Sequence, residues 1–142
     1  MMAPMYSEIF TQFGSLKTDA DRIALLQKYG TFNFKEFLNF AFNPRIKFDV
    51  VGIPPYKPSI MPAGLSESYL HNEVKKFYMF IPVHPKYAHK LQEHREQTIL
   101  RDILQALHKD EAELLVKVIQ KSLKIKNLTP ALIKKSFPDM PF

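Results

Sequence analysis

The sequence contains no cysteine among its 142 residues, and this absence excludes several kinds of chemistry. Without thiols there is no disulfide, no thiolate nucleophile and no zinc or iron–sulfur site held by cysteine. Hydrophobic runs are also short, well below the ~20 residues that span a bilayer, so we expect no transmembrane segment and no membrane partner. No basic stretch followed by an apolar one stands near the N-terminus, so we expect no secretory signal and a cytoplasmic location.

Catalytic motifs are missing as well. The sequence has no Gly-rich phosphate loop, no Gly-x-Ser-x-Gly elbow and no His-Glu-x-x-His motif. His84, His89 and His94 recur at every fifth position, but on a helix this spacing turns each by ~500° from the last, so they share no face. The carboxylates within residues 110–113 suit the start of a helix better than acid–base chemistry. We therefore expect no enzyme, no metal site and no cofactor.

The pattern that is present is helical. Thr18, Asn33 and Thr129 each stand at a helix N-cap position, the first two within capping-box spacings and the third before a proline, and Gly30 is placed to end a helix. Apolar residues then recur at helical spacing along most of the chain. The helices that we expect lie near residues 3–13, 18–29, 33–42, 66–81, 99–107, 110–124 and 129–137.

These elements predict an all-α fold of six or seven helices in one domain over residues 1–142. Four prolines between Val51 and Gly64 predict an ordered, Pro-rich central loop, because proline removes backbone donors and fixes extended geometry. Residues 137–142 form a C-terminal tail. The helical spacing places five side chains in the core: Phe37, Phe77, Leu104, Leu115 and Ile119.

The formal net charge of +6 is concentrated in one segment. Between Leu114 and Pro138 there are six lysines and no acidic residue, so the rest of the chain has a formal charge of zero. Such an asymmetry attracts polyanions such as nucleic acid, although a solvated lysine face kept for solubility is the alternative.

The spacing of these lysines predicts a DNA-binding surface. Lys117, Lys121 and Lys124 stand at i, i+4 and i+7, which places them on one face of a helix. A turn and the start of the last helix follow, where exposed amides favour a phosphate. The predicted duplex-contacting residues are Lys117, Lys121, Lys124, Lys126, Asn127, Thr129, Lys134 and Lys135.

The same residues carry a resemblance to a known family. The runs Leu114–Lys126 and Leu132–Pro138 resemble the end of the N-terminal DNA-binding domain of T4-type bacteriophage ATP-dependent DNA ligases. Upstream, Ala41–Phe48 and the following Ile53-Pro54 are similar to that domain's Ala-Tyr-Asn-Pro-Phe-x-x-Phe segment and its next proline. The chain also resembles small uncharacterised proteins of tailed phages that share this domain without the catalytic part.

The resemblance implies an all-helical fold that holds duplex DNA by its backbone, with Lys121 and Lys134 at matching contact positions and Phe137-Pro138 as structural residues. The family's Thr-Gly-Asn turn aligns near Arg95–Gln97, where Glu96 replaces the glycine and would repel phosphate. No Lys-x-Asp-Gly adenylation motif is present, so we expect no ligation.

The leading hypothesis is a non-catalytic phage accessory protein that binds double-stranded DNA through a C-terminal basic helical hairpin, in the cytoplasm of the host cell. The alternative is a protein-binding adaptor or inhibitor of a phage or host replication or defence protein. It would dock through the Pro-rich loop or the tail at residues 137–142. A small structural or assembly protein is the third interpretation.

Overall fold

The computed structural model describes residues 4–62 and 64–142. Within these residues it contains seven α-helices, one 3-10 helix and no strand, which confirms the all-α prediction. The elements are α1 (Tyr6–Ser15), α2 (Asp19–Lys28), α3 (Phe32–Phe42), α4 (Leu70–Glu73), the 3-10 helix η1 (Val74–Phe80), α5 (Glu93–Ala106), α6 (Lys109–Ile119) and α7 (Pro130–Ser136).

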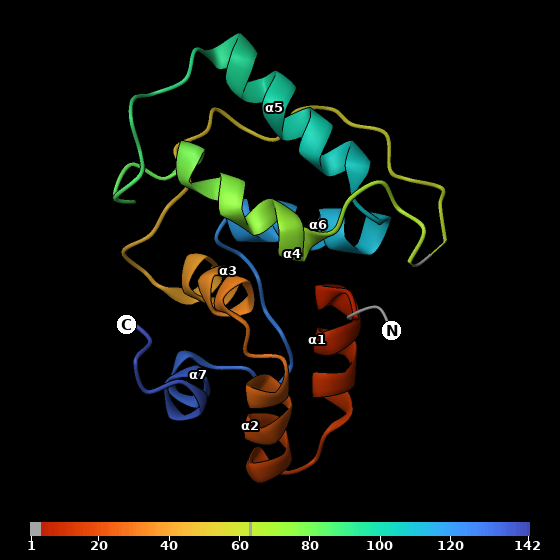
Figure 1. Ribbon diagram of the computed structural model, residues 1–142, viewed down its shortest axis with the longest axis vertical. Helices are drawn as coiled ribbons and strands as arrows, with labels where there is room; N and C mark the ends of the chain where they lie inside the picture. Colours follow the sequence, from red (N-terminus) through yellow and green to blue (C-terminus); the bar gives the residue numbers. More distant parts are fainter. Residues whose placement is uncertain (1–3, 63) are drawn as a thin grey trace.

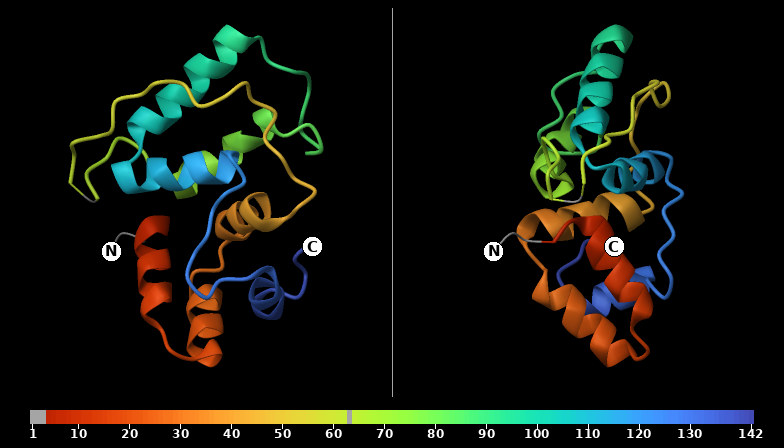
Figure 2. Two further views of the ribbon diagram at one scale, coloured as in Figure 1. Left: turned by 180° about the vertical axis from the view of Figure 1, so that it is seen from behind. Right: turned by 90° about the vertical axis from the view of Figure 1, so that its right-hand side faces the viewer.

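The helices form two groups with α3 between them (Figures 1 and 2). One group contains α4, η1, α5 and α6, and the other contains α1, α2 and α7, in which α2 packs closely on α7. Helix α3 contacts α4, η1 and α6, and α1 also contacts α6. The connection from α6 to α7 therefore leads from one group to the other, and the side view of Figure 2 shows it running along one face of the molecule.

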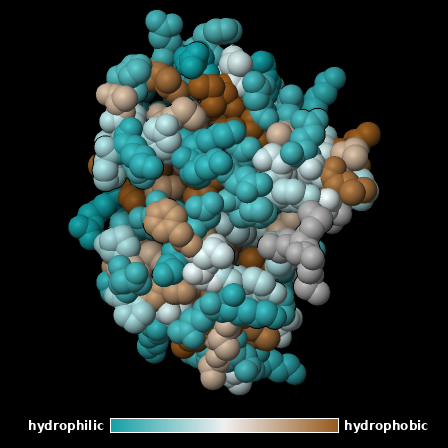
Figure 3. All heavy atoms as spheres, viewed as in Figure 1, coloured by the Kyte–Doolittle hydropathy of each residue, from teal (hydrophilic) through white to brown (hydrophobic). Residues whose placement is uncertain are grey.

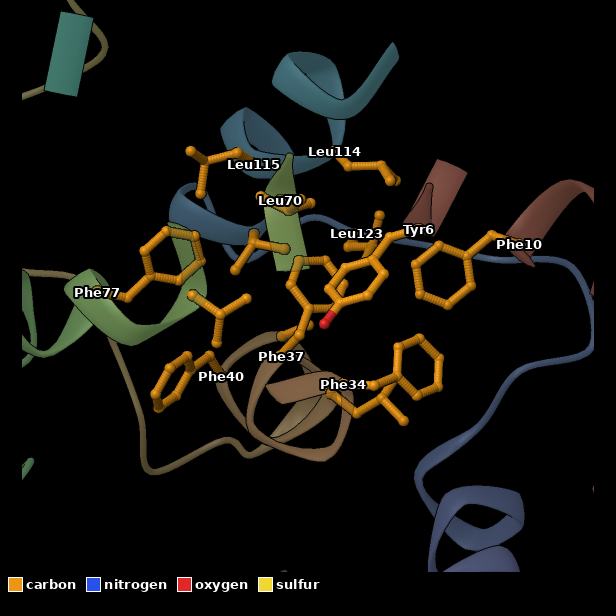
Figure 4. Close-up of a cluster of buried hydrophobic side chains, with 14 of the residues drawn as sticks. Tyr6, Phe10, Phe34, Phe37, Phe40, Leu70, Phe77, Leu114, Leu115 and Leu123 are labelled. Atoms are coloured by element: carbon orange, nitrogen blue, oxygen red, sulfur yellow. The ribbon is translucent and has the colours of Figure 1, made fainter. Parts of the chain in front are cut away.

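The core is a cluster of aromatic side chains from α1, α3 and η1, against which leucines of α6 pack (Figure 4). Tyr6 packs edge-on against Phe34 with ring centroids 5.1 Å apart, and its ring also lies 5.0 Å from that of Phe37. Aromatic pairs of this kind add to the hydrophobic stabilisation that burial provides. All five predicted core residues are buried, which confirms the apolar faces assigned from the sequence: Phe37, Phe77, Leu104, Leu115 and Ile119.

Two of the three predicted N-caps are confirmed, and α5 begins at Glu93, six residues before the start expected near residue 99. The hydroxyls of Thr18 and Thr129 cap α2 and α7, as predicted. The expected cap at Asn33 is wrong, because the N-cap of α3 is Thr31, two residues earlier, whose hydroxyl accepts the amide of Phe34 at 3.2 Å. Asn33 therefore lies inside the first turn.

The helix expected over residues 66–81 is shorter and of a different kind. It consists of one turn of α-helix, α4, followed by the 3-10 helix η1. Val74, Phe77 and Phe80 are all buried and stand three residues apart, the period at which a 3-10 helix places side chains on one face. The spacing of these three residues thus explains why the helix tightens.

The segment at residues 51–62 has no regular secondary structure and runs beside α5 (Figure 1). Its backbone is held by α5 side chains: the amide of Val51 donates to Glu96 Oε2 at 3.1 Å, and that of Lys57 donates to Gln105 Oε1 at 3.1 Å. Side chains thereby provide hydrogen bonds that no neighbouring strand supplies.

The chain end at residues 137–142 packs on the fold, so the free insertable tail expected from the sequence is wrong. Phe137 and Met140 are 6% and 4% exposed. A Cβ atom at Gly30 would lie 2.7 Å from Cε1 of Phe137, so glycine is required there for the ring to pack. Arg45 Nη2 also donates to the carbonyl of Pro141 at 3.2 Å.

Candidate nucleic-acid interface

The three lysines predicted to share one helix face do not lie on one helix, because α6 ends at Ile119. The amide of Lys121 donates to Val118 O at 3.1 Å and that of Ser122 to Lys117 O at 2.8 Å, the two bonds of a Schellman motif. Lys121 has φ 58° and occupies the left-handed position that glycine usually takes. The prediction that Lys117, Lys121 and Lys124 share one helix face is therefore wrong, because only Lys117 lies in α6.

Lys121 is turned into the protein. Its ammonium Nζ donates to the carbonyls of Phe40 at 2.8 Å and Asn43 at 2.6 Å, at the C-terminal end of α3. A cation in this place satisfies carbonyls that have no partner within the helix and complements the helix dipole. Burial lowers the pKa of the Lys121 ammonium to about 8, and the positive charge of Lys47 adds to this effect. Lys121 is thus bound internally, contrary to the predicted phosphate contact.

Two further predicted contacts have internal partners. Lys134 Nζ donates to the carbonyls of Met140, at 2.8 Å, and Phe142, and so holds the chain end against α7. The hydroxyl of Thr129 accepts the amide of Leu132 at 3.2 Å, and α7 is only seven residues long. The structure therefore leaves neither side chain free for the role that the spacing suggested.

Three predicted residues do come together, in a cleft of about 340 Å³ between α1, α6 and the segment after α6. We call this the lysine cleft. Lys117, Lys124 and Lys126 are exposed and line it, and Ser7 and Thr11 of α1 add hydroxyl groups. Figure 2 shows α1, α6 and the start of the connection to α7 side by side.

The charge of the lysine cleft is not uniform. Asp110 and Glu113, in the N-terminal half of α6, also line it, whereas Lys117 belongs to the last turn of that helix. Asn127 and Lys135 are exposed but do not line the cleft. The positive end of the cleft is therefore the end formed by the last turn of α6 and residues 124–126.

Glu111 lies outside the lysine cleft and has a structural role that the sequence pattern did not predict. It is fully buried, and its two oxygens accept the first amides of two helices: Tyr6 of α1 at 3.0 Å and Leu70 of α4 at 3.1 Å. Burial raises the pKa of its carboxyl group, and these hydrogen bonds oppose the rise. The signal was present, because Glu111 stands three and four residues before Leu114 and Leu115 on the apolar face of α6.

Glu96 has a different role from the expected one. Residues 95–97 lie in the first turn of α5 rather than in a loop that could approach DNA. The Glu96 side chain is buried, and its Oε2 accepts from the amide of Val51 and from Nε2 of Gln97. Its carboxylate therefore anchors the segment at residues 51–62.

Within the described residues, no three His, Asp or Glu side chains are close enough together to hold a metal ion. His84 lies in a turn with its Nε2 atom 4.0 Å from Glu36 Oε2, and no third ligand joins this pair. None of the helices described is both long enough and apolar enough to cross a membrane.

The fold and the lysine cleft define a small all-helical protein with a basic concave surface. The chain belongs to the Family of unknown function (DUF6433), whose model matches residues 9–125. The matched stretch includes Lys117, Lys121 and Lys124 and ends before Lys126. No curated protein matches this chain.

Proposed function

We propose that this protein binds the sugar-phosphate backbone of double-stranded DNA through the lysine cleft. The observation that carries the proposal is the convergence of Lys117, Lys124 and Lys126 from both sides of the Schellman turn onto one concave surface. Lysines placed in this way neutralise phosphates and release counterions, which gives affinity without sequence specificity.

The other groups of the cleft restrict a phosphate ligand to its positive end. Of the two α1 hydroxyls in the cleft, that of Thr11 donates to the carbonyl of Ser7 at 2.9 Å and that of Ser7 is buried, so the lysines carry the phosphate contacts. Asp110 and Glu113 repel phosphate, so the backbone would follow the end that Lys124 and Lys126 form.

The resemblance to the ligase DNA-binding domain also implies binding to duplex DNA, but it implies different contact residues. Lys121 and Lys134, the contacts that the resemblance implies, donate to carbonyls of the protein itself. The proposal therefore depends on the lysine cleft. We further propose, on the resemblance, that the protein is a non-catalytic phage accessory factor in the host cytoplasm.

Replacing Lys117, Lys124 and Lys126 together with alanine should abolish most of the affinity for duplex DNA. Each lost phosphate contact reduces the slope of log K against log salt by about 0.9, so we expect the slope to flatten by roughly 2.7. Fluorescence anisotropy with two labelled duplexes of unrelated sequence, titrated at several potassium chloride concentrations, measures both quantities. The loss should be similar for the two sequences.

A charge-matched control separates the lysine cleft from net charge. Lys17, Lys28 and Lys57 are exposed and lie outside the cleft, so their joint replacement by alanine should change the slope far less. Absence of binding by the wild-type protein at low salt would contradict the proposal. Equal losses in the two triple variants would contradict it too.

A protein-binding adaptor is the second candidate, and one observation favours it. Ile60 and Leu65 are 97% and 62% exposed, and Met61 beside Ile60 is also exposed. Figure 3 shows hydrophobic atoms at the right-hand margin, where Figure 1 draws this part of the chain. Exposed apolar groups gathered in one place are typical of protein contacts. A null result in the DNA titration would favour this candidate.

A further inference from the structure

Phe32 is exposed although it belongs to a helix whose other aromatic residues are mostly buried. It is the first residue of α3, directly after the N-cap Thr31, and it is 76% exposed. The ring forms part of the wall of three hollows, of about 400, 340 and 120 Å³. It therefore stands as a ridge with a hollow on either side, and we call this the Phe32 surface.

The largest hollow has aromatic and aliphatic walls that are held in place. Tyr6, Ile9, Tyr29 and His71 line it together with Phe32. The ring of His71 is stacked on Tyr69 with centroids 5.4 Å apart, and Asn33 Nδ2 donates to the carbonyl of His71 at 2.7 Å. A preformed apolar hollow of this size is suited to one or two apolar side chains of a ligand.

The two smaller hollows share a wall on the other side of Phe32. Phe32, Glu36, Phe40 and His84 line both of them, and Val83, which is 66% exposed, lines the larger of the two. The turn at residues 84–86 is fixed, because His84 Nδ1 accepts the amide of Lys86 at 3.1 Å. The apolar surface therefore extends from α3 to residues 81–86.

Charge decides what kind of ligand suits the Phe32 surface. Lys75 and Lys86 are exposed on this side, and neither forms an ion pair within the described part of the chain. Glu36 lines the same hollow, only 29% exposed and with its Oε2 atom 4.0 Å from His84 Nε2, and its carboxylate would repel a closely packed phosphate backbone. Apolar walls and two free ammonium groups favour a protein segment with apolar and acidic side chains over a nucleic acid.

We propose that the Phe32 surface docks a segment of a partner protein that carries apolar side chains on both sides of Phe32 and carboxylates opposite Lys75 and Lys86. This surface is separate from the lysine cleft, since no residue lines both. Aromatic residues are enriched in the cores of protein interfaces, and the hollows beside Phe32 leave room for partner side chains to bury its ring.

The test uses the full chain and a random library of 16-residue peptides displayed on phage. Selected peptides should combine spaced aromatic or aliphatic residues with Asp or Glu. Phe32→Ser should weaken their binding at least tenfold, and a Lys75→Glu, Lys86→Glu variant should weaken it by a similar factor. Val51→Ser, which alters another exposed apolar residue outside the Phe32 surface, is the matched control and should leave binding unchanged. Ile60→Ser tests the competing apolar patch on the Pro-rich loop.

Several results would overturn the proposal. The library could yield no peptide, or basic peptides, or peptides that depend on Ile60 rather than Phe32. Self-association of the wild-type chain in sedimentation, lost in Phe32→Ser, would show that a second copy occupies the surface. Binding of labelled single-stranded DNA that Phe32→Ser removes would show a base-stacking site instead. Because Phe32 is exposed, its variant should keep the wild-type circular dichroism and melting temperature, which confirms that the fold is intact.

Discussion

Replacing Glu111 with alanine is expected to lower the free energy of unfolding by about 3 to 5 kcal/mol. The substitution removes the acceptor of two buried amides, those of Tyr6 and Leu70, and each then loses its hydrogen bond without gaining water. It also leaves a cavity where a fully buried side chain stood. Urea denaturation followed by circular dichroism measures the change.

Glu113→Ala, on the exposed side of the same helix, is the matched control and should shift stability by no more than ~0.5 kcal/mol. Glu111→Gln tests the charge separately. Because burial raises the pKa of Glu111, the native state binds more protons than the unfolded state just above the ordinary carboxyl pKa. The stability of the wild type relative to Glu111→Gln should therefore fall as pH rises through that window. A loss below 1 kcal/mol in Glu111→Ala would show that other groups or water satisfy these amides.

Local signals in the sequence predicted most of the fold. Thr18 and Thr129 cap helices because a hydroxyl can reach an amide in the first turn of its own helix, which depends on nearby residues alone. The end of α6 escaped prediction because a lysine, rather than glycine, occupies the left-handed position at residue 121. The 3-10 helix escaped for another reason: Leu70, Val74 and Phe77 also fit the spacing of an α-helix.

The sequence predicted which segment carries the candidate site, but not which of its side chains form the surface. A charge count finds the basic segment, yet it does not show which ammonium groups face solvent. Lys121 and Lys124 look alike in the sequence, and only the fold places Phe40, 81 residues away, next to Lys121. Ser7 and Thr11 lie far from the lysines in the sequence and join the cleft only because α1 packs on α6. Contacts between distant segments therefore decide the site.

Replacing Lys121 with methionine is expected to cost about 2 to 3 kcal/mol of stability, although a surface lysine normally contributes very little. Methionine keeps most of the side-chain volume but leaves the carbonyl of Phe40 without its Lys121 donor, while that of Asn43 keeps only the amide of Ile46. Lys124→Met is the matched control, since Lys124 is exposed and has no such partners. Equal stabilities of the two variants in urea denaturation would contradict the internal role of Lys121.

The backbone and the charge of Lys121 can be tested separately. At φ 58° a Cβ atom is strained, so Lys121→Gly should be more stable than Lys121→Ala by about 1 kcal/mol, although both lose the ammonium. Burial lowers the pKa of the Lys121 ammonium to about 8, below that of a lysine in the unfolded chain. Between these two pKa values the unfolded state binds more protons, so the stability of the wild type relative to Lys121→Met should rise with pH above about 8. A relative stability that falls over this range would show that the α3 carbonyls hold the ammonium more strongly than burial opposes it.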